Sequence, residues 1–77
     1  MTYYYEFTLD GNIIGYTQPF HKDLLPDLNK TRYKSEALLQ FCDKYSLNCM
    51  DVEVEIAAMR SDRADKTLEF DFKYNGR

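Results

Sequence analysis

Residues 50–58 read M-D-V-E-V-E-I-A-A, an alternation of apolar and acidic residues on which the fold prediction for the whole chain depends. Successive side chains of a β-strand point to opposite faces, so this period of two predicts a half-buried strand. The face expected to pack on a core consists of Met50, Val52, Val54, Ile56 and Ala58. The other face would hold Asp51, Glu53 and Glu55 in a row. Because these like charges repel one another, the row favours contact with water, a cation or a basic partner.

Residues 2–17 predict a β-hairpin. Two alternating segments flank Asp10-Gly11, which suits a type I′ turn because both central residues of that turn need positive φ. A two-residue turn would pair Leu9 with Asn12, Phe7 with Ile14 and Tyr5 with Tyr16, and would leave Tyr4, Glu6, Thr8, Ile13 and Thr17 on the opposite face. A three-residue loop through Asn12 would instead shift the register by one residue and invert the faces of the second strand.

Residues 35–45 predict an amphipathic helix of about three turns. Its apolar stripe consists of Leu38, Phe41, Cys42 and Tyr45. Ser35 is the expected N-cap, because its hydroxyl can accept a hydrogen bond from a free backbone N–H of the first turn. The stripe is expected to cover one face of a sheet.

Residues 18–34 are expected to form a long irregular loop, because Pro19 and Pro26 interrupt strands and helices. Leu24, Leu25 and Leu28 are spaced for at most one helical turn and would tuck under the sheet. The loop is also positively charged, which makes it a candidate site for nucleic acid.

Residues 67–74 again alternate and predict a last strand, with Leu68, Phe70, Phe72 and Tyr74 facing the core. A polar turn at residues 61–66 would join it to residues 50–58 as an antiparallel hairpin. The order strand, strand, helix, strand, strand predicts an α+β fold of ββαββ type, in which one helix packs on one face of a four-stranded antiparallel sheet.

Composition limits the possible functions. With 77 residues we expect a single domain, residues 1–77, in which an aromatic content of 16% compensates for a small core. A net charge of −3 without clustered Lys and Arg argues against a protein that binds mainly nucleic-acid phosphates. We find no membrane-spanning or signal-peptide pattern and therefore expect a cytoplasmic protein without a membrane partner. Cys42 and Cys49 are then expected to be free thiols.

The face away from the helix is the main candidate for function. Its predicted interface consists of Tyr4, Glu6, Asp51, Glu53, Glu55, Glu69 and Asp71. Aromatic anchors combined with aligned charges are typical of protein-binding surfaces, although a solvated face whose charges prevent aggregation would show the same pattern. The hypothesis is a non-enzymatic inhibitor or regulator that docks on a basic surface of a larger protein. Mobile elements such as phages often encode small proteins of this kind to block defence proteins.

Two other hypotheses use different surfaces. The alternative function is nucleic-acid binding by the basic loop, with Phe20 or Tyr33 stacking on bases and with phosphate contacts from His21, Lys22, Lys30, Arg32 and Lys34. A homodimer through an edge strand could accompany either function. Catalytic residues, a metal site and a cofactor are not predicted, because a flat, open sheet offers no desolvated pocket in which a carboxyl pKa would shift.

Overall fold

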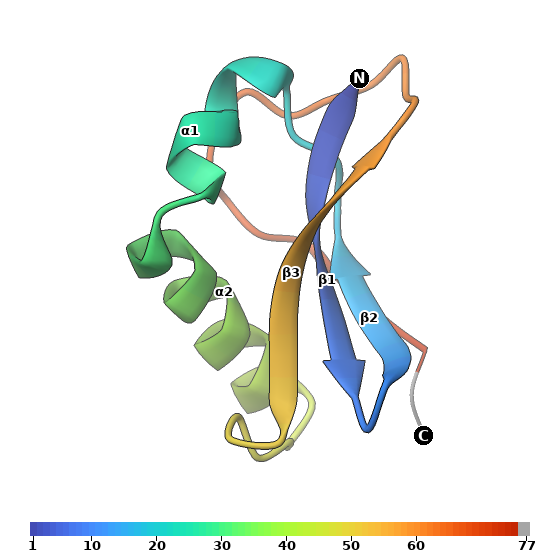
Figure 1. Ribbon diagram of the computed structural model, residues 1–77, viewed down its shortest axis with the longest axis vertical. Coiled ribbons are helices and arrows are strands. Elements are labelled where there is room, and N and C mark those ends of the chain that lie inside the picture. The colour runs from blue at the N-terminus through green and yellow to red at the C-terminus, as the bar shows by residue number, and fades with distance from the viewer. Residues whose placement is uncertain (76–77) are drawn as a thin grey trace.

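A four-stranded antiparallel sheet in the order β3-β1-β2-β4 forms the main layer of the protein. The computed structural model describes residues 1–75. The strands are β1 (Thr2–Leu9), β2 (Asn12–Thr17), β3 (Val52–Met59) and β4 (Phe72–Tyr74). The helices lie on one side of the sheet, and within the described residues no helix covers the other side (Figure 1). The predicted α+β fold with a four-stranded antiparallel sheet is confirmed.

The predicted hairpin between residues 50–58 and 67–74 is wrong, because β3 and β4 lie at opposite edges of the sheet. β3 pairs with β1 along all of its eight residues. The chain then crosses the helix side of the sheet and pairs with β2 as the three-residue strand β4. On the way, the ring centroid of Phe70 lies 5.9 Å from that of Tyr5 and 6.0 Å from that of Phe20. Crossing over the core packs Phe70 against Tyr5 and Phe20, which removes apolar surface from water.

The β1–β2 hairpin closes through a two-residue turn, as predicted. Asp10 and Gly11 have positive φ angles of 53° and 79°, which a type I′ turn requires. Leu9 therefore lies opposite Asn12, and the alternative loop through Asn12 is not used.

Farther from the turn, a β-bulge shifts the register of this hairpin. The predicted pairs of Phe7 with Ile14 and of Tyr5 with Tyr16 are therefore wrong, since Phe7 lies opposite Gly15. A bulge places two residues of one strand opposite one residue of the other, so the side chains that follow it point to the other face.

The bulge inverts the faces of the last residues of β2. Tyr16 lies on the open face opposite Glu6 and is 39% exposed, whereas Thr17, predicted to face outward, is only 2% exposed. The physical reason lies at Gly15, where a Cβ atom would be 2.5 Å from the ring of Phe41. The core aromatic ring occupies the space in which a side chain would otherwise stand.

Residues 18–34 are partly helical rather than irregular. They form the short helices η1 (Lys22–Leu24) and α1 (Leu25–Leu28) before α2 (Thr31–Lys44) begins. Pro26 lies in the first turn of α1, where the missing N–H group of proline costs no helical hydrogen bond. The expectation that this proline prevents a helix is wrong for that reason.

Helix α2 begins at Thr31 rather than after a cap at Ser35, so the predicted N-cap is wrong. The actual N-cap is Lys30, which makes no side-chain capping bond, and the first turn contains no acid. The N–H of Lys30 instead donates to the carbonyl of Asp27 at 2.9 Å, so the end of α1 sets the start of α2. None of the helices within residues 1–75 is long and apolar enough to cross a membrane.

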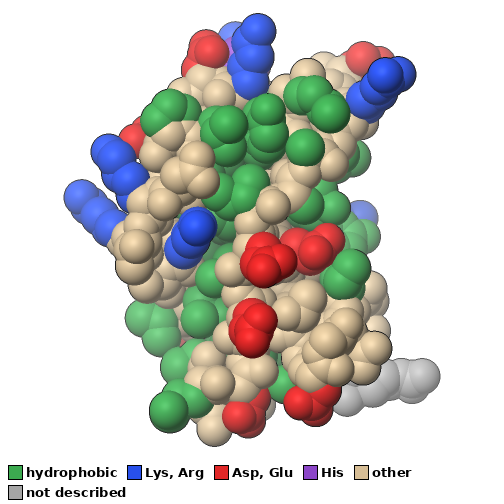
Figure 2. Space-filling view, viewed as in Figure 1, with side chains coloured by type: hydrophobic (Ala, Val, Ile, Leu, Met, Phe, Trp, Pro, Cys, Tyr) green, Lys and Arg blue, Asp and Glu red, His purple; other side chains and the backbone are tan. Residues whose placement is uncertain are grey.

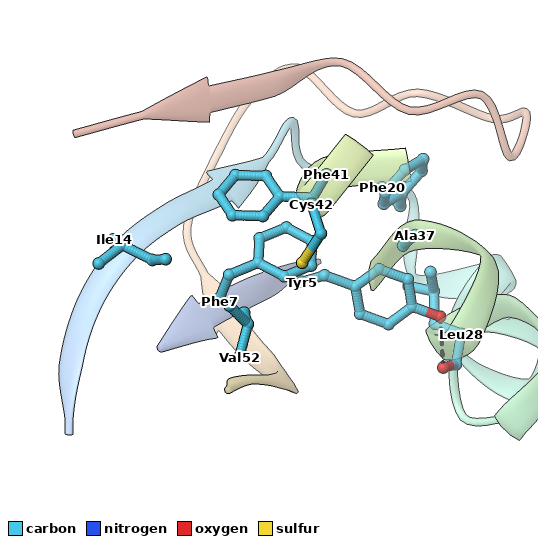
Figure 3. Packing of buried hydrophobic residues seen from close by; sticks show 9 residues of the cluster. All are labelled: Tyr5, Phe7, Ile14, Phe20, Leu28, Ala37, Phe41, Cys42 and Val52. Carbon is cyan, nitrogen blue, oxygen red and sulfur yellow. Dashed lines mark hydrogen bonds between the residues drawn. The ribbon is translucent and has the colours of Figure 1, made fainter. Parts of the chain in front are cut away.

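Phe41 of α2 lies at the centre of the core. Its ring stacks on that of Phe7, with 4.1 Å between centroids and 6° between planes. Figure 3 shows these rings between the sheet and the helices, together with the neighbouring Cys42. The predicted helical stripe is confirmed, because Phe41 and Cys42 are buried and Leu38 and Tyr45 pack against the same cluster.

Tyr5 joins β1 to α1. Its hydroxyl donates a hydrogen bond of 2.7 Å to the carbonyl of Leu28, drawn as the dashed line in Figure 3. Both residues are fully buried. The expectation that leucines of residues 18–34 pack under the sheet is therefore confirmed at Leu28.

The first residue of the stretch 50–58 does not face the core. Met50 is 90% exposed, because it lies in the turn before β3, where its N–H donates to Asn48 Oδ1 at 3.0 Å. Val52 is the first inward residue and is 4% exposed. Ala58 near the other end of β3 is exposed as well, so the inward face of this strand is shorter than predicted.

Candidate protein-binding surface

Three acidic side chains lie together on the open face of the sheet, which is the face away from the helices. Glu6 of β1 is directly opposite Glu55 of β3, and Glu53 is opposite Thr8. Glu6, Glu53 and Glu55 are named the acidic row. Figure 2 shows acidic side chains gathered over the β1–β3 part of the molecule. Within residues 1–75 none of these three carboxylates forms an ion pair.

An open hollow of about 600 Å³ adjoins the acidic row on the same face. Its walls are mainly apolar and include Tyr4, Tyr16 and Met59. It is named the tyrosine hollow. Asp71 and Lys73 also line it, so its own charges balance. An apolar side chain is the kind of group that such walls would shield from water.

Tyr4 links the hollow to the acidic row. Its ring meets that of Tyr16 edge to face, with centroids 6.1 Å apart. Partial burial, followed by the neighbouring Glu6 carboxylate, raises the pKa of the Tyr4 phenol above its ordinary value. Like any tyrosine phenol it is protonated at neutral pH, so its hydroxyl can act as a hydrogen-bond donor.

The other three predicted acids lie outside the acidic row. Asp51 precedes β3, in the turn that also contains Met50. Glu69 and Asp71 lie on the crossing segment, where the Gln18 amide donates to the Glu69 carbonyl and accepts from the Asp71 N–H. Only Asp71 reaches the tyrosine hollow. The structure thus brings Tyr4 and the acidic row together, whereas Asp51 and Glu69 lie outside the strands.

Sequence reasoning misses several residues that line the hollow. It places Tyr16 in the core because it does not predict the bulge, and it places Gln18 and Pro19 in the loop. A signal for the bulge is present in the sequence. Gly15 interrupts an otherwise β-branched and aromatic strand, and a glycine inside a strand often marks a bulge or a close backbone approach.

Comparisons with protein-family models, with curated proteins and with solved structures found no match. Among residues 1–75, no group of three or more His, Cys, Asp or Glu side chains lies close enough to hold a metal ion. The inference of function therefore rests on the shape and charge of the open face.

The two cysteines form no disulfide bond. Burial, with a smaller contribution from Cys49, raises the pKa of the Cys42 thiol above its ordinary value. A thiol that stays protonated is a weak nucleophile, so Cys42 contributes to the core rather than to covalent chemistry.

The basic residues of the alternative hypothesis are spread over several elements instead of one loop. His21 caps η1 and Lys22 lies in it, whereas Lys30 caps α2 and Arg32 and Lys34 lie in the first turns of α2. Lys30 also pairs with the Asp27 carboxylate at 3.2 Å. Part of this positive charge is therefore engaged within the protein.

The two aromatic residues of that hypothesis differ in exposure. Phe20 is fully buried, so the expectation that it stacks on bases is wrong. Tyr33 is half-buried, and the guanidinium carbon of Arg32 lies 5.3 Å from its ring centroid. Base stacking there would compete with this contact.

Proposed function

We propose that this protein is a non-enzymatic binding module, a small inhibitor or regulator that docks the open face of its sheet on a basic surface of a larger protein. The observation that carries the proposal is the direct pairing of Glu6 with Glu55 beside the tyrosine hollow. Like charges directly opposite each other destabilise a sheet. A partner that supplies cations would relieve this repulsion, which nothing within residues 1–75 relieves by an ion pair.

The hollow favours the interpretation of the open face as a protein-binding surface over its interpretation as a face that contacts only water. Charges that only prevent aggregation need no exposed aromatic side chains, yet Tyr16 is 39% exposed and Met59 is 40% exposed beside the row. In protein interfaces a few buried aromatic or apolar contacts supply most of the affinity, while charges steer the encounter. The partner's epitope would thus combine an apolar anchor, which enters the hollow, with lysines or arginines next to it.

The compartment is part of this proposal. A cytoplasmic setting, in which thiols stay reduced, agrees with unbonded Cys42 and Cys49. The origin expected for such a module, a mobile element or phage that blocks a defence protein, stays a hypothesis to be tested by the identity of the partner.

Charge reversal tests the proposal. Tagged protein would capture partners from the lysate of its native host, and mass spectrometry would identify them. The double variant Glu53→Lys with Glu55→Lys should lose the captured protein. The matched control is Glu36→Lys with Asp43→Lys, which changes the net charge equally on the exposed face of α2 and should retain it. Circular dichroism verifies that both variants fold. Equal capture by both variants would place the interface elsewhere.

The contribution of the hollow has its own test. Tyr16→Ala should weaken binding to the identified partner by about tenfold or more, as expected for an aromatic anchor. Leu39→Ala, which removes a 57% exposed side chain of α2 on the helix side of the sheet, should have little effect. Titration calorimetry with the purified partner distinguishes the two. Equal losses would contradict a role for the hollow.

Nucleic-acid binding is the competing function. The observation in its favour is that the start of α2 carries Arg32 and Lys34 without an acid in the first turn. Mobility-shift assays at low salt with single- and double-stranded oligonucleotides test it directly. A shift at micromolar protein that Arg32→Ala with Lys34→Ala removes would favour nucleic acid. The absence of any shift would leave the protein-binding proposal.

A further inference from the structure

β3 presents an unpaired backbone edge along its whole length. In an antiparallel pair every second residue directs its N–H and C=O groups away from the neighbouring strand. β3 lies at the end of the sheet order and has β1 as its only paired strand, and no other segment of residues 1–75 forms backbone hydrogen bonds to it. Its eight residues contrast with the three residues of β4 at the opposite edge.

Apart from charged side chains, the common devices that protect a sheet edge are absent from β3. Such edges are usually blunted by proline, lysine, a bulge or a very short strand. The sequence V-E-V-E-I-A-A-M contains no proline or basic residue, and its register with β1 runs without a shift from Val52 to Met59. Only Glu53 and Glu55 place charge on this edge. Both are exposed and both point to the open face.

These two glutamates determine which strand can pair there. In antiparallel pairing of two β3 strands, the registers centred on Val54 or Glu55 place Glu55 opposite Glu53 or Glu55 of the second copy, whereas the register centred on Ile56 places it opposite Ala57. Directly opposed like charges are destabilising, whereas opposed unlike charges are stabilising. The other edge of a second copy offers only β4, with Lys73 as its single charged side chain. The row therefore disfavours the self-pairings that oppose glutamates, and it favours a basic strand as the partner of this edge.

We infer that the β3 edge takes up an extended basic segment of the partner as an additional strand of the sheet. The inference rests on the proposed function, because the segment belongs to the same partner. Lysines or arginines two residues apart would lie opposite Glu53 and Glu55 on the open face. The residue between them would point to the helix side, next to the half-buried Val54, and would be apolar. The recognised segment thus alternates basic and apolar residues.

Three synthetic peptides of equal length and charge test this mode of binding. The first alternates Lys or Arg with Val or Ile. The second has the same composition in scrambled order. The third keeps the alternating sequence but is N-methylated at every second residue, which removes the amide protons needed for edge pairing and leaves the charges unchanged. Each peptide is titrated into the full chain by calorimetry, and amide hydrogen exchange is followed by NMR.

The alternating peptide should bind, and the scrambled and methylated peptides should bind about tenfold or more weakly, because several backbone hydrogen bonds are lost. Exchange should slow at every second amide from Val52 to Met59, the amides that do not face β1. Glu53→Lys with Glu55→Lys should abolish the binding, whereas Glu36→Lys with Asp43→Lys should retain it.

Other outcomes would overturn the inference in distinguishable ways. Equal affinity for all three peptides would show that charge alone attracts the segment, and docking of the open face would then stand without strand addition. No binding of the alternating peptide at millimolar concentration would also overturn it. So would concentration-dependent protection of β3 without peptide, because a second copy would then occupy the edge. Loss of partner capture by the charge-reversed variant would still support the proposed function in each case.

Discussion

The two faces of the sheet are built from alternate residues of the same strands, but they follow different physical rules. On the inward face of β1, Tyr5 and Phe7 are fully buried, and each makes a specific contact with a helix. On the open face, Glu6 lies opposite a like charge and Tyr4 borders an open hollow. The inward face thus explains the stability of the fold. The open face adds nothing comparable to stability, so its composition can be set by binding.

The largest expected effect on stability comes from a substitution at the centre of the inward face. Phe41→Ala should cost about 3–5 kcal/mol, because it removes the ring that stacks on Phe7 and leaves a cavity. Small domains are stable by about 5–15 kcal/mol, so this substitution would remove a large part of the free energy of unfolding. Urea unfolding measures the loss. Leu39→Ala on the 57% exposed side of the same helix is the control and should change stability by less than about 0.5 kcal/mol. Similar losses for both would contradict the central position of Phe41.

The next effect tests why the bulge exists. Gly15→Ala should destabilise the protein by about 1–3 kcal/mol, because the new methyl group would overlap the Phe41 ring and the carbonyl oxygen of Lys73. The penalty should shrink when Phe41 is replaced by Leu, and the part that comes from the Lys73 carbonyl should remain. A double-mutant cycle measured by denaturant unfolding gives this coupling. Additive effects of the two substitutions would mean that the ring does not determine the backbone at Gly15.

The inward face was also the more predictable one. Alternation and helical spacing identified Val52, Phe41 and Cys42 as core residues because burial imposes a period on the sequence. Strand order was less accessible. Pairing of residues 50–58 with 67–74 assumes that neighbours in sequence pair in space, whereas the segment crosses over the core, where Phe70 packs against Tyr5.

The residues of the open face could be predicted from the sequence only in part, because some of them depend on contacts between distant segments. Tyr4, Glu6, Glu53 and Glu55 follow from simple alternation, and the structure brings them together. Tyr16 depends on a bulge whose cause is a close approach between Gly15 and a helix distant in sequence. Local sequence patterns do not predict this contact between distant segments. The hollow, which needs the far end of β2 and the crossing segment, could not be derived without it.

A smaller expected effect on stability comes from Tyr5 on the inward face and depends on pH. Burial raises the pKa of the Tyr5 phenol above its ordinary value of 10.0, so the folded protein holds this proton more tightly than the unfolded chain does. The corresponding stability is fully present below about pH 10 and declines as the pH rises further. Tyr5→Phe should cost about 1 kcal/mol at neutral pH through loss of the hydrogen bond to Leu28, and should reduce the alkaline decline.

Urea unfolding of both proteins between pH 7 and about pH 11 tests this prediction. Some decline should persist in the variant, because burial also raises the pKa of Tyr4 and of Cys42. An alkaline decline of the same size in Tyr5→Phe as in the original protein would show that the Tyr5 proton does not contribute to it.

The smallest expected effect is a gain in stability. It comes from the open face, whereas substitutions on the inward face lower stability. Glu55→Gln should stabilise the protein by roughly 0.2–1 kcal/mol, because it removes the repulsion from Glu6 directly across the β1–β3 pair. Salt should shrink the gain, since it screens exposed charges. Once Glu6 is also changed to Gln, the second neutralisation should add little.

Glu69→Gln makes the same charge change at an exposed site outside the strands and should give a smaller gain. Thermal unfolding at low and high salt compares these variants. If Glu55→Gln destabilises the fold, the acidic row is part of what holds the sheet together, and the argument that a partner explains its placement fails.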